Sequence, residues 1–192
     1  MAKKESTLAN MIIALVAVTF AASTSLGFVY QLTKEPIAAA KLAKKMEAIQ
    51  NVLPEFNNEP NMEVYKIPVD GDTLYFYPAK EDGGLVGTAI ESFTNQGFTG
   101  KIKIMVGFMP DGSIYDVAVL EHKETPGLGD KMERKKSNWG LQFKGKDPKI
   151  FNVSVTKDGG DVDAITASTI SSRAFCDALN RAYNTYMEGG EK

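Results

Sequence analysis

The sequence contains one cysteine and one histidine, and these shortages exclude several kinds of site. Cys176 alone cannot form an internal disulfide or supply a CxxC pair for a metal or for thiol redox chemistry. Its place in a helical pattern predicts a small buried residue. His122 alone leaves little for a histidine-based metal site or a Ser-His-Asp triad. We therefore expect no metal site and no catalytic residue on this chain.

The chain also lacks a basic excess. Its formal net charge is -2 at pH 7, and its sequence pI is near 5.5. These values argue against nucleic acid as a partner, because neutralising phosphates requires a basic face. No GxGxxG follows a predicted strand, so nothing indicates a dinucleotide site. With 192 residues, of which 43% are hydrophobic and 24% charged, the chain is typical of a folded protein with one core.

A long uncharged run lies near the N-terminus. Twenty residues, Met11–Tyr30, contain no charge, and apolar character continues to Leu32. A helix of this length spans about 30 Å, the thickness of a bilayer's hydrocarbon core. Small residues within it suit close packing on another membrane helix. We predict a transmembrane helix over residues 11–32, preceded by a short tail over residues 1–10.

A cleaved signal peptide is the alternative for this run. Lys3 and Lys4 would then form its basic start, and Ala21–Ser23 a loose cleavage site. The apolar residues beyond that site favour a retained anchor. Lysines are more numerous after the span than before it, which slightly favours a cytoplasmic domain. Long domains cross membranes largely regardless of charge, so charge counting leaves the orientation open.

The remaining residues predict an α+β fold, with a twisted antiparallel sheet and flanking helices. A helical pattern opens at Glu35-Pro36 and ends before Pro54, giving a juxtamembrane helix and linker over residues 33–60. A domain over residues 61–187 and a C-terminal tail over 188–192 follow. Strands are predicted at Val64–Val69, Leu74–Pro78, Leu85–Phe93, Lys101–Phe108, Ile114–Leu120 and Ile150–Val155. A short surface helix is predicted at Asp130–Lys136, a final helix at Ser171–Tyr186, and a hairpin turn at Met109–Ser113.

Two stretches of the predicted domain contain residues that are typical of ligand-binding sites. The first, His122-Lys-Glu-Thr-Pro-Gly-Leu-Gly129, directly follows the predicted strand Ile114–Leu120, and its glycines permit positive φ angles or close approach to a ligand. By itself it is also compatible with an ordinary turn. In the second, five of the seven residues Thr166–Ser172 carry a hydroxyl, ahead of a helical pattern. Capping needs one or two of them. A helix N-terminus also favours a phosphate, so both interpretations remain open.

Both stretches resemble the FMN-binding domain family that includes the G subunit of the Rnf electron-transport complex. In that family a threonine in an Asp-x-x-(Ser/Thr)-Gly-Ala-Thr-x-(Ser/Thr) motif carries FMN through a phosphoester. The segment Asp163–Ser171 aligns with this motif without gaps, except that Ala167-Ser168 replaces Gly-Ala. The stretch Glu124–Gly129 is similar to the family's second signature, which lines the flavin. Asn138-Trp139 and Gln142–Gly145 form a third similar stretch.

The resemblance implies covalent FMN on Thr169. It further implies that Asp163 and Ser171 are recognised by the flavin transferase that attaches it. The residues expected at the cofactor are Thr169, Thr166, Ala167, Ser168, Ile170, Ser171, Glu124, Thr125, Gly127, Leu128 and Gly129. Alanine at position 167 restricts the backbone if the motif requires positive φ, and Ser168 adds a second candidate nucleophile. For Trp139 we weigh stacking on a ring against burial in the core. For His122 we weigh contact with the flavin against a loop position satisfied by backbone groups, and favour the loop position.

The resemblance also implies the biological role. Such a chain is an electron-carrying subunit, without a complete active site of its own, in a membrane complex that couples ferredoxin:NAD oxidoreduction to Na⁺ or H⁺ translocation. Its partners would be the other Rnf subunits, the flavin transferase and the lipid bilayer. The family places the flavin domain outside the cytoplasm, on a single-pass anchor in the inner membrane. Two alternatives remain: the C subunit of the sodium-pumping NADH:quinone oxidoreductase, and an anchored binding module without a redox group.

Overall fold

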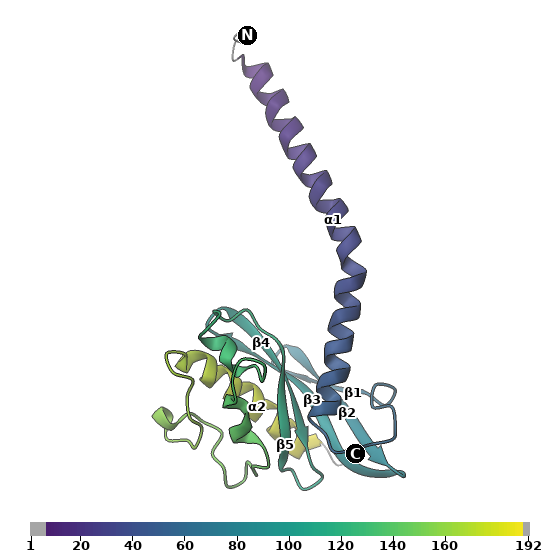
Figure 1. Cartoon of the computed structure of the whole chain (residues 1–192), viewed down its shortest axis with the longest axis vertical. Helices are drawn as coiled ribbons and strands as arrows, with labels where there is room; N and C mark the ends of the chain where they lie inside the picture. Colours follow the sequence, from purple (N-terminus) through teal and green to yellow (C-terminus); the bar gives the residue numbers. More distant parts are fainter. Residues whose placement is uncertain (1–6, 190–192) are drawn as a thin grey trace. The chain divides into compact units, whose positions relative to one another are not determined.

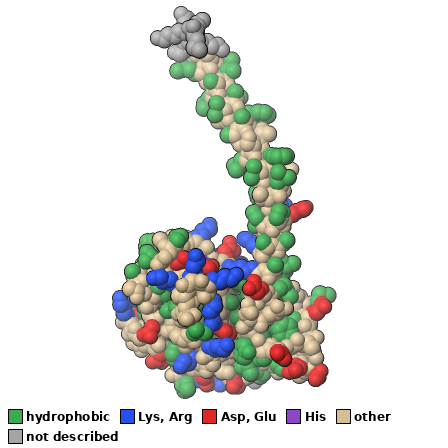
Figure 2. Space-filling model, in the orientation of Figure 1, with side chains coloured by type: hydrophobic (Ala, Val, Ile, Leu, Met, Phe, Trp, Pro, Cys, Tyr) green, Lys and Arg blue, Asp and Glu red, His purple; other side chains and the backbone are tan. Residues whose placement is uncertain are grey.

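A computed structural model describes residues 7–189. The first element is the helix α1, Leu8–Asn51, which is 44 residues long. Its N-terminal part is long and apolar enough to cross a membrane, and Figure 2 shows hydrophobic side chains along it. Hydroxyls in this part bond within the helix, as Thr19 Oγ1 does to the Leu15 carbonyl at 2.9 Å. A spanning helix needs such internal partners, because lipid offers none.

The prediction that a second helix opens at Glu35-Pro36 is wrong, because α1 continues through Pro36. Proline removes one backbone hydrogen bond and usually kinks or ends a helix. Here the next turns contain alanine, leucine and lysine, which are strong helix formers. The Thr33 hydroxyl also donates to the Val29 carbonyl at 2.9 Å, within the turn that precedes the proline.

The sheet is a five-stranded antiparallel meander in the order β1-β2-β3-β4-β5 (Figure 1). Its strands are β1 Tyr65–Val69, β2 Asp72–Glu81, β3 Gly84–Gly97, β4 Gly100–Phe108 and β5 Ile114–Glu121. The first five predicted strands are confirmed, most with longer bounds. The predicted turn Met109–Ser113 is confirmed as well, since the Met109 N–H donates to the Ser113 carbonyl at 2.8 Å.

Two predicted elements after β5 are wrong. Residues Ile150–Val155 form turns, with one isolated bridge from Val155 to Val162, because the Asn152 N–H is taken by the Asp161 carboxylate. In place of a surface helix over Asp130–Lys136, there is the 3-10 helix η1, Gly129–Met132, whose Asp130 and Met132 are buried. Two further 3-10 helices follow, η2 Trp139–Phe143 and η3 Thr156–Asp158.

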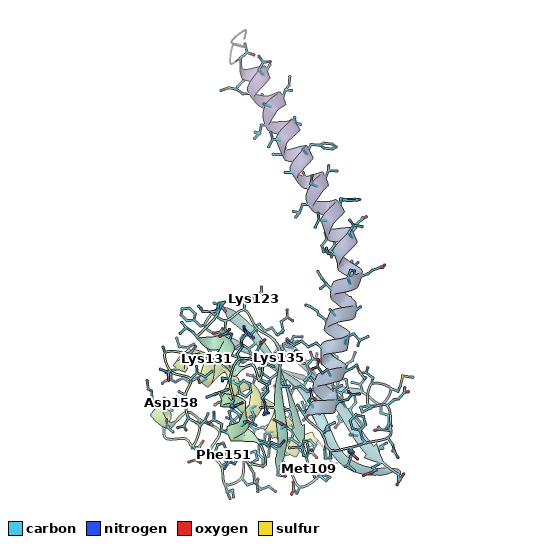
Figure 3. All side chains as sticks on the ribbon, viewed as in Figure 1. Met109, Lys123, Lys131, Lys135, Phe151 and Asp158 are labelled. Carbon is cyan, nitrogen blue, oxygen red and sulfur yellow. The ribbon has the colours of Figure 1, made fainter. Side chains whose placement is uncertain are left out.

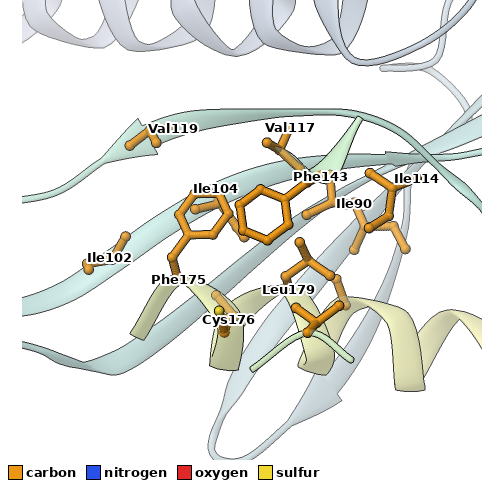
Figure 4. Packing of buried hydrophobic residues seen from close by; sticks show 14 of the residues in the cluster. Ile90, Ile102, Ile104, Ile114, Val117, Val119, Phe143, Phe175, Cys176 and Leu179 are labelled. Atoms are coloured by element: carbon orange, nitrogen blue, oxygen red, sulfur yellow. The ribbon is translucent and has the colours of Figure 1, made fainter. Parts of the chain in front are cut away.

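The C-terminal helix α2, Thr169–Gly189, covers one face of the sheet. It begins two residues before the predicted start, a difference that places Thr169 in its first turn. Alternate strand side chains pack against it, as period-two alternation requires. Figure 4 shows Phe143 of η2 and Phe175 of α2 among the strand isoleucines. Cys176 is buried in this core, as predicted, and burial raises the pKa of its thiol to about 12.

The C-terminal end of α1 and the residues directly after it cover the other face of the sheet. Ile49 and Val52 are fully buried there, beside Ala89 and Met105. Gly107 on β4 permits this packing, because a Cβ atom built on it would lie 1.6 Å from the Val52 carbonyl oxygen. Lys45 also reaches the buried carboxylate of Glu91, with 2.8 Å between Nζ and Oε2. This packing on both faces leaves one end of the sheet for the site described next.

Candidate functional site

A cavity of about 320 Å³ opens where three segments meet: the β3–β4 turn, the loop after β5 and the first turn of α2. Ligand sites in proteins commonly have volumes from about 300 Å³ upward. Its lining is formed by Phe98, Glu124, Thr125, Leu128, Gly129, Ala167, Ser168, Thr169, Ile170 and Ser171. The three large apolar side chains among them are all exposed to solvent in part: Phe98, Leu128 and Ile170. The cavity therefore combines an apolar rim with a hydroxyl-rich base.

A tight turn over Ile165–Ser168 directly precedes α2. The Ser168 N–H donates to the Ile165 carbonyl at 2.9 Å, and Ala167, the third residue of the turn, has φ = +61°. Positive φ at this position is typical of a type II turn, in which glycine is preferred. The expectation that alanine restricts this part of the motif is confirmed in its geometry, since the residue is held in a region that disfavours a side chain.

We expect Ala167→Gly to raise the free energy of unfolding by about 1 kcal/mol, because glycine adopts positive φ without steric cost. The gain is reduced by the greater freedom of glycine in the unfolded chain. Urea unfolding of the full chain in detergent, followed by circular dichroism, measures it. Ala164→Gly is the matched control, since Ala164 is outside the positive-φ region, and it should destabilise. A destabilised Ala167→Gly chain would contradict the strain assigned to this turn.

Backbone donors of residues that line the cavity at the start of α2 lack partners in the described part of the chain. The Ser168 carbonyl accepts the Ser172 N–H at 3.1 Å, the first bond of the helix. The N–H groups of Thr169, Ile170 and Ser171 have no acceptor within residues 7–189. Free donors at the N-terminus of a long helix, with the positive end of its dipole, form an anion site.

The hydroxyls of this turn differ in their partners. Ser171 Oγ donates to Glu124 Oε2, and Ser168 Oγ lies 2.9 Å from Ser171 Oγ. Because the single hydroxyl proton of Ser171 goes to the carboxylate, the proton between the two serines belongs to Ser168. By contrast, Thr169 is half-buried and lines the cavity, and its hydroxyl bonds to no group in the described part of the chain. The hydroxyl of Thr125, which also lines the cavity, has no partner there either, but among the lining residues only Thr169 combines such a hydroxyl with a place in the first turn of α2.

Glu124 joins the three segments that enclose the cavity. Its side chain is 5% exposed. Oε1 accepts from the N–H and the hydroxyl of Thr99 at 3.0 and 3.1 Å, and Oε2 accepts from Ser171. Burial would raise the pKa of Glu124, but the hydrogen bonds from Ser171 and Thr99 outweigh it and hold the pKa below its ordinary value of 4.5. The carboxylate is therefore a fixed acceptor and a weak base.

Gly129 is required beside this carboxylate. A Cβ atom at that position would lie 2.7 Å from both Ser171 Oγ and Glu124 Cβ. His122 holds the same loop from the other side, since its Nδ1 accepts the Glu124 N–H at 3.0 Å and its Nε2 lies 3.1 Å from Glu133 Oε1. The prediction that His122 is a loop histidine is confirmed, but only one of its ring nitrogens bonds to a backbone group, and the other lies against the Glu133 carboxylate.

A Glu124→Gln chain should lose about 1–2 kcal/mol of stability at pH 7, because the amide replaces a charged acceptor of three hydrogen bonds. The sign of the pH dependence follows from the lowered pKa. The carboxylate contributes its stability above pH 4.5, and this contribution is lost as the pH falls through the folded-state pKa. The difference between wild type and Glu124→Gln should therefore shrink below pH 4.5. Thermal unfolding between pH 3 and 7 measures it, and a constant difference would contradict the role of the charge.

The structure brings together most of the residues expected at the cofactor. Thr166 and Gly127 are the exceptions, since neither lines the cavity. Asp163 also lies outside the lining, with its side chain exposed. Phe98 was missed by sequence reasoning, although an aromatic residue next to Gly97 at a hairpin turn is a detectable signal. Of the two interpretations for Trp139, packing on the core is observed.

The lining fits the group that the resemblance implies. The partly exposed Phe98, Leu128 and Ile170 can contact a flat apolar ring system. The free N–H groups and the Thr169 hydroxyl can contact a phosphate, with the hydroxyl in reach of an ester bond. The structure contains no cluster of three or more potential metal-ligating side chains among residues 7–189. The lining residues are thus suited to bind a ligand that has both a phosphate and an aromatic ring system.

Comparisons with known proteins agree with this site. Residues 97–184 match the model of the FMN-binding domain family. Three relatives, each named as the G subunit of an ion-translocating oxidoreductase complex, are similar over most of their length. The protein of Haemophilus influenzae (strain PittEE) is 39% identical over 162 residues, 80% of this chain and 78% of the relative. The protein of Erwinia tasmaniensis is 37% identical over 182 residues, which cover 90% of this chain and 86% of the relative. The protein of Vibrio cholerae serotype O1 (strain M66-2) is 34% identical over 178 residues, which cover 88% of this chain and 85% of the relative.

The aligned residues amount to 80–90% of this chain, far more than the flavin motifs alone. The chain belongs to the family formed by the G subunits of ion-translocating oxidoreductase complexes.

Proposed function

We propose that this chain is an electron-transfer subunit of an ion-translocating oxidoreductase complex and carries FMN joined through its phosphate to Thr169. One observation supports Thr169 as the attachment site: this residue lines the cavity, its hydroxyl has no partner within residues 7–189, and it belongs to the first turn of α2, whose backbone N–H groups lack acceptors in the same range. The family model and the relatives from ion-translocating complexes support FMN and the complex. Bound FMN supplies the redox chemistry, and the chain supplies position and electrostatics.

The attachment uses the chain's residues in distinct roles. The Thr169 oxygen would form the new O–P bond to the flavin donor's phosphorus, the P–O bond to the donor's leaving group would break with its electron pair going to that group, and the hydroxyl proton would pass to water. The N–H groups of the first turn of α2 would hold the phosphate oxygens. Glu124 fixes Ser171 and, through it, Ser168, so that these hydroxyls keep the turn in shape. Phe98, Leu128 and Ile170 would contact the ring system.

A covalent bond serves retention of the cofactor. A flavin held by hydrogen bonds alone dissociates at a rate set by its affinity. A domain outside the cytoplasm could not easily recapture it. We propose this orientation from the family, with α1 as a single-pass anchor in the inner membrane and the flavin transferase as the maturation partner. The complex would couple ferredoxin:NAD oxidoreduction to Na⁺ or H⁺ movement, and this chain would relay electrons between the other subunits.

Intact-mass spectrometry of the full chain tests the proposal. The chain is purified from cells with and without the coexpressed flavin transferase, denatured and weighed. We expect the added mass of one FMN with the transferase, and a fluorescent band on a denaturing gel under ultraviolet light. A chain that gains no mass and shows no fluorescence in the presence of the transferase would favour an anchored module without a redox group. Copurification with components of the sodium-pumping quinone reductase would instead favour that complex as the site of action.

A further inference from the structure

The backbone of Asp163 is clamped by side chains from η2. The Asp163 N–H donates to Gln142 Oε1 at 2.8 Å, and Gln142 Nε2 donates to the Asp163 carbonyl at 3.3 Å. Trp139 Nε1 donates to the same carbonyl at 2.5 Å. One side-chain amide therefore satisfies both backbone groups of this residue, as a neighbouring strand would. These are the residues of the third stretch that the sequence singled out.

The clamp is itself anchored in the core. The Trp139 ring meets the rings of Phe143 and Phe175 edge-on, with centroids 5.3 and 5.1 Å apart. Phe143 and Phe175 are fully buried and stack on one another, as Figure 4 shows. Gln142 Nε2 also donates to the Trp139 carbonyl at 3.0 Å, which fixes the amide on η2. Asp163 is thus tied to the packed interior through rigid aromatic contacts.

The segment between Asp163 and α2 is held at its other end as well. Ser172 Oγ accepts the Ile165 N–H at 2.9 Å, and the turn at Thr166-Ala167 follows directly. Arg173, one residue later, forms two hydrogen bonds with Asp158 of η3, a residue labelled in Figure 3. The ties to Asp163 and Ile165 use backbone groups. The Asp163 carboxylate is left exposed, without a hydrogen-bond or ion-pair partner in the described part of the chain.

We infer that Trp139 and Gln142 are positioning residues for the modification of Thr169: their clamp presents the Asp163 carboxylate to the flavin transferase at a fixed place relative to the start of α2. The inference rests on the proposed attachment of FMN to Thr169. A carboxylate on a free loop would have to be ordered when the enzyme binds, and ordering a segment costs affinity. The clamp orders the segment before the flavin transferase binds, so that this cost does not reduce the affinity. The surface of the enzyme that binds the Asp163 carboxylate should be basic.

The test measures the initial rate of covalent flavin incorporation into the full chain in detergent, with purified transferase and its flavin donor. In-gel fluorescence is followed at several chain concentrations. We expect Gln142→Ala to lower kcat/KM about tenfold, mainly through KM. Trp139→Phe, which keeps the aromatic packing and removes the N–H, should lower it about threefold. Asn180→Ala is the matched control, because Asn180 Nδ2 ties a different loop, at the Val153 carbonyl, at 2.8 Å.

A double-mutant cycle separates positioning from a general effect on stability. In an Asp163→Ala background, Gln142→Ala should change kcat/KM less than about twofold, because the carboxylate that it presents is gone. Equal effects in both backgrounds would overturn the inference. So would modification of Gln142→Ala at the wild-type rate while its Asp163 N–H exchanges faster with deuterium. If the wild-type chain accepts no flavin, the proposed function fails first, and the inference fails with it.

Discussion

A Thr169→Val chain will fold and remain in the membrane, and it will carry no covalent flavin. Valine preserves the shape of threonine and removes the oxygen that the ester needs. The Thr169 hydroxyl bonds to no group within residues 7–189, so its loss breaks no hydrogen bond in the protein. We expect the change in the free energy of unfolding to stay within about 0.5 kcal/mol. Denaturing-gel fluorescence and intact mass measure the flavin, and circular dichroism measures the fold.

Ser168→Ala is the control for this variant. The Ser168 hydroxyl bonds to Ser171, so the variant loses one hydrogen bond and about 1 kcal/mol of stability. It should still be labelled to the wild-type extent, because its oxygen is not the one in the ester. If Thr169→Val stays labelled while Ser168→Ala does not, the attachment is at Ser168, and the register proposed for the motif is one residue too far along the chain.

Gly107→Ala will destabilise the folded domain by about 3 kcal/mol or more. The added Cβ would lie 1.6 Å from the Val52 carbonyl oxygen and 2.6 Å from its carbon. Backbone atoms cannot rotate away as a side chain does, so the chain at the end of α1 must lift from β4. Lifting exposes Val52 and Leu53, each of which stabilises the fold by about 1.5–3 kcal/mol when buried. Urea unfolding of the full chain in detergent gives the difference.

Gly140→Ala is the matched control for this substitution. Gly140 is also buried, but the nearest atom to its added Cβ, Val117 Cγ2, is 3.6 Å away, which is ordinary contact. We expect its stability to stay within about 0.5 kcal/mol of the wild type. Comparable losses of stability in the two variants would mean that the close approach of Val52 to β4 does not limit stability. The backbone around Gly107 could then move to accommodate an extra methyl group.

The sheet could be predicted because each strand carries its own signal. Lys101–Ile104 alternates charged and apolar residues, Ile114–Leu120 is rich in β-branched and apolar residues, and a Pro-Asp-Gly turn lies between the two strands, all of which is local information. The predicted strand at Ile150–Val155 was wrong because it rested on local information alone. Its apolar run does not reveal that the Asp161 carboxylate accepts the Asn152 N–H, which a neighbouring strand would otherwise bond. Helix continuity through Pro36 depends on the surrounding turns, which a rule about proline alone ignores.

The site was predictable where motifs are contiguous and unpredictable where the fold brings distant segments together. Glu124 and Ser171 were named from separate motifs, but their direct hydrogen bond is a result of the fold. Phe98 joins the cavity from the β3–β4 turn, far from both motifs in the sequence. Comparison with the motif predicted that alanine at position 167 restricts the backbone, and the positive φ of Ala167 is the physical reason.

The chain's single tryptophan has a further consequence. Because the indole of Trp139 touches the loop backbone with its nitrogen and the aromatic core with its rings, its ultraviolet emission is a built-in reporter of that loop. Release of the loop would expose the indole to water and move the emission to longer wavelength, with no dye attached. Variants that weaken the contact, such as Gln142→Ala, can therefore be recognised by this shift in emission without any label.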